Sequence, residues 1–457
     1  ELAMPKKKTA LTIEERLQQA LVPAEEQPYE VPENWVWVYG KNIFMPMESR
    51  KPDGEDFYYI DIDAIDNKNQ VVTEAKKIKK AQAPSRASRK LHTGDTVFSL
   101  VRPYLKNIAY IDVQLSDCIA STGFFVCTPN ATLNDRYLYR LMVSSYVVDG
   151  LNKYMKGDNS PSIRKDDIEN YPFPLPPLSE QQRLVERIEE LFAKLDEAKE
   201  RLQEVADSFA VRKAAILHKA FTGELTKQWR RKNGVSDESW EEKKLGEVGS
   251  WLGGGTPSTS REEYWENGNI LWITSKDMKS TVIEDTLMKV NEKGVKNSSA
   301  NYIEKPALLV VMRSGILRRT FPVAMVKKPF TVNQDLKAII PDEDDLEFLY
   351  WMLLSNEQRI LNTCMKNGTT VESINSNALK DLTFKCPTLP EQHEIVRLID
   401  ALLARERAAQ QAAEQALASI DLMKKSILAR AFRGELGTNK ASEASALELL
   451  RQVLAEN

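Results

Sequence analysis

The sequence is poor in the residues that form covalent or metal cross-links. It has only four cysteines, none of them in a C-x-x-C pair, and only three histidines, which are isolated. These features argue against a disulfide framework and against structural zinc, so we expect a protein of a reducing cytoplasm. Also absent is any stretch near the ~18–20 consecutive apolar residues that a membrane helix requires.

A strong net charge is lacking too. The formal net charge is −3, which by itself predicts no acidic partner. The basic residues are nevertheless clustered: residues 76–106 contain nine Lys or Arg and one acid, and residues 305–334 contain six Lys or Arg and no acid. Such patches suit a groove that binds a polyanion, although a solvated basic loop would give the same pattern.

The chain contains one segment that is repeated. "KAAILHKAFTGEL" at 213–225 recurs as "KKSILARAFRGEL" at 424–436. A shift of 211 residues aligns 180–225 with 391–436 without a gap, and 16 of the 46 positions are identical. Ordinary composition would give about three identities by chance. The chain is therefore a tandem duplication, in which each half has ~150 varied residues followed by a repeated segment.

Both repeated segments have the pattern of long helices. In the first, apolar residues recur at alternating spacings of four and three, as in a coiled-coil seam, and Ser179 with Gln182 forms a capping box. A helix from Ser179 to Leu217 would be about 58 Å long, and Gly223 suits its C-terminal end. The bulky seam residues of the first copy match alanines in the second, which favours antiparallel pairing, although each helix could instead pack only on its own domain. The residues predicted to pair are Leu184, Ile188, Leu191, Leu195, Leu202, Phe209, Ile395, Ile399, Leu402, Ala409, Ala413 and Ile420.

The predicted fold class is α+β, with two mixed α/β domains alternating with two long antiparallel coiled-coil helices related by a pseudo-two-fold axis. Aromatic and Val/Ile-rich runs such as "NWVWVYG", "FYYIDID" and "ILWIT" predict strands, and "DDLEFLYWMLLSNEQRILNTCM" predicts a surface helix. Two short flanking helices, in 11–35 and 444–457, are expected to pack near one another or on a partner. The predicted segments are an N-terminal helical segment (1–28), a first domain (29–178), a central helix (179–225), a second domain (226–389, with a linker at 226–235), a distal helix (390–436) and a C-terminal helical tail (437–457).

Several of these segments carry a family resemblance. "PLPPLSEQQRLVERI" (174–188), "CPTLPEQHEIVRLI" (386–399), "GGGTPSTSREEYWENGNILWIT" (253–274) and the paired "AFTGEL" and "AFRGEL" endings resemble the specificity subunit of bacterial type I restriction–modification enzymes. The resemblance covers nearly the whole chain. It implies two target recognition domains that each read one half of a bipartite, asymmetric DNA site, with the two helices acting as a ruler between them.

The same resemblance implies partners. Two modification subunits, which are methyltransferases that bind S-adenosylmethionine, would dock on the helices, and restriction subunits would join the full complex in a bacterial or archaeal cytosol. The chain itself would bind double-stranded DNA, hold no cofactor or metal and catalyse no reaction.

Most of the candidate DNA-binding residues are basic, and they lie in or near loops. Arg102 and Arg313 follow apolar runs at positions that match in sequence, and the planar fork of arginine suits guanine edges or phosphates. Lys156 and Lys366 precede the loops "KGDNSPS" and "KNGTTVES", whose polar groups can bond phosphates or base edges. The set is completed by Ser162 and Ser373 in those loops and by Lys106, Arg86, Arg89, Lys90, Arg318 and Arg319, which we expect near phosphates.

Two alternatives stay open. Asp53, Glu74 and Lys76 have the loose spacing of a metal-dependent nuclease, but Asp53 lies in "KPDGED", which is typical of a turn. No Asp/Asn-Pro-Pro-aromatic tetrapeptide of an adenine methyltransferase is present, and we find no catalytic constellation. The other alternative is a coiled-coil adaptor with no DNA role, which salt-dependent duplex binding would exclude.

Overall fold

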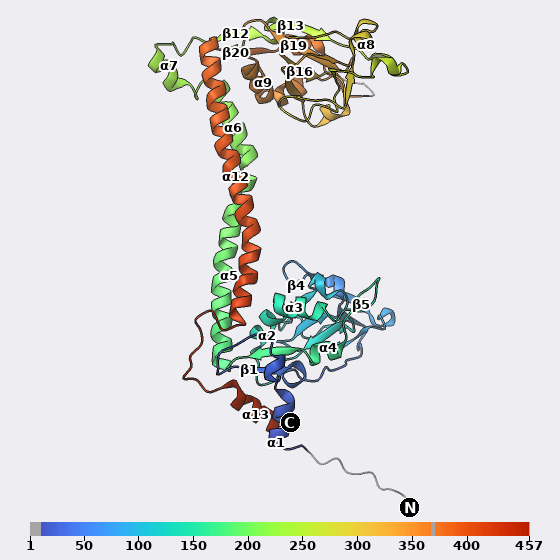
Figure 1. The fold of residues 1–457 in the computed structure, drawn as a ribbon, viewed down its shortest axis with the longest axis vertical. Helices are drawn as coiled ribbons and strands as arrows, with labels where there is room; N and C mark the ends of the chain where they lie inside the picture. The colour runs from blue at the N-terminus through green and yellow to red at the C-terminus, as the bar shows by residue number, and fades with distance from the viewer. Residues whose placement is uncertain (1–10, 367–370, 457) are drawn as a thin grey trace, which may run out of the picture. The chain divides into compact units, whose positions relative to one another are not determined.

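The computed structural model describes residues 11–366 and 371–456, and the chain forms two compact units. One unit comprises Glu1–Leu202 and Gln415–Asn457, and the other comprises Gln203–Glu414. Each unit mixes helices with short strands and is continued by long helices, as the predicted α+β class requires (Figure 1). Helix α12 (Leu389–Ala431) gives its first part to the second unit and its last part to the first.

The first unit is built on small antiparallel and mixed sheets. Strand β7 lies between β10 and β8, β2 and β9 form the parallel centre of a four-stranded sheet, and β1 pairs with β11. Its strands are β1 (Val36–Tyr39), β2 (Asp56–Ile60), β3 (Ile65–Asp66), β4 (Val71–Val72), β5 (Lys76–Lys79), β6 (Ala87–Lys90), β7 (Thr96–Ser99), β8 (Ile108–Tyr110), β9 (Ile119–Ser121), β10 (Phe124–Cys127) and β11 (Pro172–Leu175). Its helices, besides the end of α12, are α1 (Ile13–Ala20), α2 (Asp135–Met142), α3 (Ser145–Asn152), α4 (Lys165–Glu169), α5 (Leu178–Asp207, up to the unit boundary) and α13 (Ala446–Glu456).

The second unit repeats this plan with longer strands. Strand β16 lies between β17 and β19, as β7 lies between its two neighbours, and β12 pairs with β20. Its strands are β12 (Glu241–Lys244), β13 (Gly249–Gly253), β14 (Ile270–Ile273), β15 (Met288–Val290), β16 (Ala307–Val311), β17 (Val323–Val326), β18 (Phe330–Val332), β19 (Leu336–Pro341) and β20 (Thr383–Cys386). Its helices, besides the start of α12, are α6 (Phe209–Phe221), α7 (Lys227–Asn233), α8 (Glu292–Lys296), α9 (Leu346–Ser355), α10 (Glu357–Cys364) and α11 (Ser376–Lys380).

The duplication extends from the long helices into both domains. Helices α4 and α11 begin 211 residues apart, and so do strands β11 and β20. The runs "NWVWVYG" and "ILWIT" contain strands β1 and β14, and "FYYIDID" overlaps strand β2, as predicted.

Within the first unit, the start of α5 packs on the end of α12. Leu184 and Ile188 share one buried core with Leu428 and Phe432. Because the beginning of one helix meets the end of the other, the two helices are antiparallel here (Figure 1). Farther along, Lys424 forms an ion pair with Asp196.

Within the second unit, α6 packs on the start of α12 in the same way. Leu217 shares a buried core with Ile395 and Ile399. Glu406, which interrupts the apolar seam in the sequence, forms an ion pair with Arg212 of α6. The interruption is therefore a polar contact between helices.

The helical repeat departs from prediction at a break. The expected single helix from Ser179 to Leu217 is two helices, because α5 ends at Asp207 and α6 begins at Phe209. At the break, the carbonyl oxygen of Val205 accepts hydrogen bonds from Ser208 Oγ (3.1 Å) and Arg212 Nη2 (3.0 Å). Side chains that take over a helical carbonyl in this way interrupt the i→i−4 ladder.

The predicted capping box is also wrong. Helix α5 begins at Leu178, one residue earlier, and the Pro177 carbonyl accepts from the N–H groups of residues 180 and 181 at 2.9 Å each. Ser179 Oγ donates instead to Glu443, and Gln182 contacts Asn134. The C-terminal signal is confirmed, since Gly223 has φ +78° after α6.

The seam of α12 differs from the predicted heptads in its first half. Ala409 is exposed and lies outside the seam, while Leu403 is buried more deeply than Leu402. Buried positions at Ile395, Ile399 and Leu403 are spaced by four, because this part of α12 packs on its own domain core as well as on α6.

The predicted surface helix is two helices, and the first is internal. Asn356 separates α9 from α10, and all residues from Phe348 to Leu353 are buried. A helix that is apolar on every side belongs in a core. None of the helices in the described ranges combines the length and apolar character that crossing a bilayer requires.

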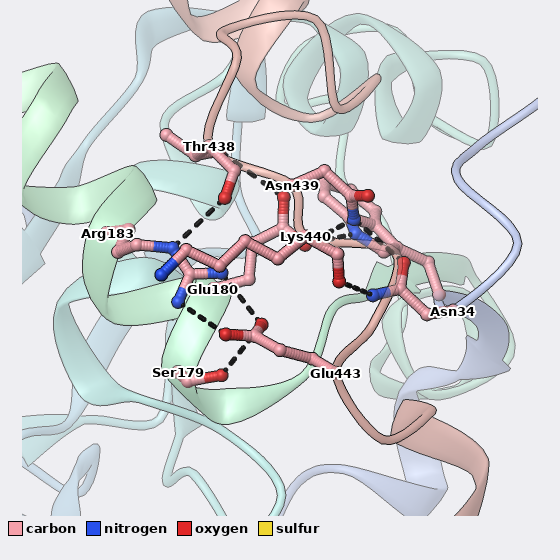
Figure 2. Close-up of polar contacts among 9 residues, drawn as sticks. Asn34, Ser179, Glu180, Arg183, Thr438, Asn439, Lys440 and Glu443 are labelled. Carbon is pink, nitrogen blue, oxygen red and sulfur yellow. Dashed lines mark hydrogen bonds and ion pairs between the residues drawn. The ribbon is translucent and has the colours of Figure 1, made fainter.

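The two ends of the described chain meet in the first unit. Helix α1 packs on α13, and Glu14 lies 3.5 Å from Arg451, as expected for the flanking segments. Figure 2 shows the neighbouring polar cluster, in which Arg183 of α5 bonds both carboxylate oxygens of Glu443 at 2.8 and 2.7 Å. The segment after α12 is thereby fastened to the start of α5.

Candidate nucleic-acid interface

In the first unit, strand β7 leads into a strained basic turn. After β7 the chain forms a 3₁₀ turn, Pro103–Leu105, with Arg102 before it and Lys106 after it. Both flanking residues are left-handed, with φ of 48° and 57°, which is uncommon for residues other than glycine. Proline disfavours the right-handed helical conformation for the residue before it, and Arg102 does not adopt that conformation.

A second loop is bonded to this turn. The Arg102 N–H donates to the Pro161 carbonyl at 2.8 Å, and Arg102 Nη2 donates to the Asn159 carbonyl at 2.8 Å. Lys156 and Ser162 exchange two backbone hydrogen bonds of 3.0 Å, which close the loop between them. The structure therefore brings together the predicted residues Arg102, Lys156 and Ser162.

The second unit holds an equivalent pair of loops. The Ser314 N–H donates to the Glu372 carbonyl at 3.0 Å, and the Lys366 N–H donates to the Ser373 carbonyl at 2.9 Å. Arg313 and Ser373 form an isolated β-bridge. Residues 367–370, the Asn-Gly-Thr-Thr part of the predicted loop, lie outside the described residues.

The hydrogen-bond register corrects one equivalence. Val101 bridges Ser162 where Arg313 bridges Ser373, so Arg313 corresponds to Val101 and Arg102 corresponds to Ser314. The prediction that the two arginines are equivalent is wrong by one residue. The strand of the second unit is longer than β7, and this shifts the register between the strand and the turn.

The arginines of the second unit have acidic neighbours. Arg313 Nε lies 2.7 Å from Asp335 Oδ1, and Arg318 forms an ion pair with Glu372. The hydrogen bond from Arg318 holds the pKa of Glu372 below its usual value. Sequence reasoning missed both acids, because Asp335 lies one residue beyond the acid-free window and Glu372 is distant in the chain.

Three of the remaining basic candidates, Arg86, Arg89 and Lys90, lie in or just before strand β6. Lys90 pairs with Glu48 at 2.6 Å, and this contact lowers the pKa of the Glu48 carboxyl. Arg86 lies closer to the turn. Its carbonyl accepts from the Thr122 N–H at 2.8 Å, and the carbonyl of Gly123, the residue after Thr122, accepts from the Leu100 N–H at 2.8 Å. Within the described ranges, seven candidates have no carboxylate within 4.0 Å: Arg86, Arg89, Arg102, Lys106, Lys156, Arg319 and Lys366.

The nuclease pattern does not assemble. Asp53 contacts Arg50 at 3.4 Å, and Lys76 bonds Asp63 at 2.6 Å, which raises the pKa of the lysine. Among residues 11–366 and 371–456, no group of three or more His, Cys, Asp or Glu side chains is arranged to hold a metal ion.

Comparison with known proteins agrees with the duplicated basic loops. The family model "Type I restriction modification DNA specificity domain" matches twice, at 41–207 and 237–416. The chain is 42% identical over 161 residues to the Escherichia coli type I restriction enzyme EcoR124I/EcoR124II specificity subunit, a match that covers 35% of this chain and only 40% of that relative. It is 26% identical over 353 residues to the E. coli EcoDI specificity subunit, covering 71% of this chain and 77% of the relative.

A solved structure extends the likeness over most of the chain. The HsdS subunit from Thermoanaerobacter tengcongensis is 26% identical to this chain and superposes on it with a TM-score of 0.69. The match covers 90% of this chain and 100% of the HsdS chain. The two family matches together span more than half of this chain. The chain belongs to the type I restriction–modification specificity subunits, which recognise the DNA sequence for their system.

Proposed function

We propose that the two units each bind one half of a bipartite, asymmetric site in double-stranded DNA. One observation carries this proposal: both units present basic side chains on the same backbone scaffold, a turn after β7 or β16 bonded to a Lys–Ser loop. The scaffold is common to both units, but the side chains on it differ. Because base identity is read by side chains, the two half-sites should have different sequences.

The chain chooses the sequence, and its partners act on it. Two modification subunits bind S-adenosylmethionine and methylate adenine, restriction subunits join the full complex, and the specificity chain itself catalyses no step. Support comes from the family membership and from the repeated helices, which offer equivalent surfaces to two copies of one partner. The complex would work on DNA in the bacterial or archaeal cytosol, with the repeated helices setting the gap between half-sites.

The test is a map of methylated adenines in cells that express this chain with its modification partner. We expect one bipartite motif with unlike halves. Exchanging residues 29–178 for the corresponding domain of a relative should change one half of the motif and leave the other half unaltered. A motif that changes in both halves, or methylation without a motif, would contradict the proposal.

A further inference from the structure

Each unit exposes an aliphatic side chain at the tip of its basic turn. In the first unit, Leu105 is 39% exposed and the neighbouring Tyr104 is 46% exposed. In the second unit, the 3₁₀ turn Gly315–Arg318 carries Ile316, which is 40% exposed. Each turn begins a few residues after an inner strand of its sheet, β7 or β16, and its backbone is bonded to the Lys–Ser loop.

Both tips are held in place and have cationic neighbours, and in the second unit one of these cations, Arg318, is paired with Glu372. Leu105 lies between the left-handed residues Arg102 and Lys106, and its N–H donates to the Arg102 carbonyl at 2.9 Å. Ile316 precedes Arg318 and Arg319, and its carbonyl accepts from the Arg319 N–H at 3.0 Å. A left-handed backbone at two residues other than glycine costs free energy, which is typical of positions that serve a function.

An aliphatic group among cations matches one feature of duplex DNA. The cations suit phosphates, which carry no sequence information. The thymine 5-methyl group is the one apolar group that base pairs present in the major groove, and aliphatic side chains contact it. An aliphatic side chain fixed between phosphate-binding cations is therefore placed to distinguish thymine from the other bases.

We propose that Leu105 and Ile316 are specificity-determining residues, each of which reads a thymine in a different half-site through the 5-methyl group. This inference rests on the proposed function and adds the chemistry of one base contact in each half. The flanking arginines and lysines bind the phosphates of the DNA backbone. A displacement of the turn by one base pair would therefore lose both the phosphate contacts and the methyl contact.

Other exposed aliphatic residues provide matched controls. Val113 is 72% exposed and Leu287 is 75% exposed, but Val113 lies beside Asp112, and the Leu287 N–H bonds Asp277. Neither residue belongs to the turn after β7 or the turn after β16, so neither is expected to make the proposed contact.

The experiment uses the complex of this chain with its modification subunit and begins with the methylated motif. Duplexes containing the motif are then made with deoxyuridine in place of thymidine, one position at a time, which removes only the methyl group. Affinity is measured for the native complex and for Leu105→Ser, Ile316→Ser, Val113→Ser and Leu287→Ser. The loss of one buried methyl contact predicts about fourfold weaker binding at one thymine in each half-site.

The variants assign each contact. Leu105→Ser should abolish the sensitivity to deoxyuridine in one half-site only, Ile316→Ser in the other only, and the two controls should leave both intact. If no deoxyuridine position weakens the native complex while its motif is still methylated, the inference fails and the proposed function stands. If Leu105→Ser or Ile316→Ser prevents assembly with the modification subunit, the turn is a protein contact and the inference is wrong. If no motif is methylated at all, the proposed function fails first.

Discussion

The two copies of the repeat bury the same glutamate and satisfy it differently. Glu180 and Glu391, 211 residues apart, are both fully buried near the start of a long helix. Glu391 accepts from Arg230 Nη1 at 2.6 Å and from the Thr226 hydroxyl at 2.7 Å. Its other oxygen, Oε2, has no hydrogen-bond partner within the described part of the chain.

Glu180 is surrounded by neutral donors. Its carboxylate accepts from Trp35 Nε1 at 2.8 Å, from the Asn439 amide at 2.6 Å and from the Thr438 hydroxyl at 3.3 Å (Figure 2). In each copy the donors include residues that follow the C-terminal end of the other repeated helix, after α6 for Glu391 and after α12 for Glu180. A buried carboxylate must be satisfied, and the duplication has reached two solutions, one ionic and one neutral.

The largest expected effect comes from the ionic copy. Arg230→Ala would leave Glu391 charged, buried and without its cation, and breaking a buried pair in this way costs roughly 3–5 kcal/mol. Urea unfolding followed by circular dichroism measures the loss. The double variant Arg230→Ala with Glu391→Gln should recover part of it, because the stranded charge is gone. Equal losses in the single and double variants would show that Arg230 acts through packing.

A smaller effect is expected in the neutral copy. Asn439→Ala removes one of three donors to Glu180, and an unsatisfied buried acceptor costs about 1–3 kcal/mol. Lys440→Ala is the matched control, since its side chain is exposed and such changes usually fall within about 0.5 kcal/mol. Should Asn439→Ala cost as much as Arg230→Ala in the same unfolding assay, the distinction between ionic and neutral solutions would not stand.

The two basic turns extend the comparison from stability to DNA binding. Arg102 has no carboxylate within 4.0 Å in the described ranges, whereas Arg313 forms an ion pair with Asp335. We expect Arg102→Ala and Arg313→Ala each to weaken binding about tenfold through one half-site only, which is about 1.4 kcal/mol. Fluorescence anisotropy on duplexes with one half scrambled at a time measures this. An equal loss on every duplex would indicate a general effect of charge.

The smallest effect concerns Glu443, beside the Glu180 cluster. Its hydrogen bonds with Arg183 lower the pKa of Glu443 in the folded state. A lowered folded-state pKa gives stability that is present above the unfolded pKa and disappears as the pH falls through the folded value. Glu443→Gln should therefore lower Tm slightly near pH 7, and the difference from the native chain should shrink below about pH 4. A difference that stays constant with pH would mean that the charge of Glu443 contributes nothing.

Periodicity and repetition were strong enough to predict the duplication, the long helices and their antiparallel pairing. The local details were weaker. At the break at Ser208, Arg212 reaches back to the Val205 carbonyl, and near the start of α5 the Ser179 hydroxyl bonds Glu443 instead of capping the helix. The contact between Ser179 and Glu443 joins residues distant in the chain and leaves no local signal, whereas the break at Ser208 is local and was masked by an apolar periodicity that continues through it. The candidate basic residues were found by type, but their acidic partners Asp335 and Glu372 were not, because ion pairs form across the fold.

The sequence by itself determined that one segment occurs twice and that each copy is helical and amphipathic, because the periodic spacing of apolar residues is encoded along the chain. Only the tertiary structure decided that Arg313 corresponds to Val101, since register is set by hydrogen bonds between strand and loop. It also decided that Glu391 is buried against an arginine, whereas Glu180 is buried among neutral donors. Burial and ion pairing depend on residues that folding brings together from distant parts of the chain, so local sequence patterns do not reveal them.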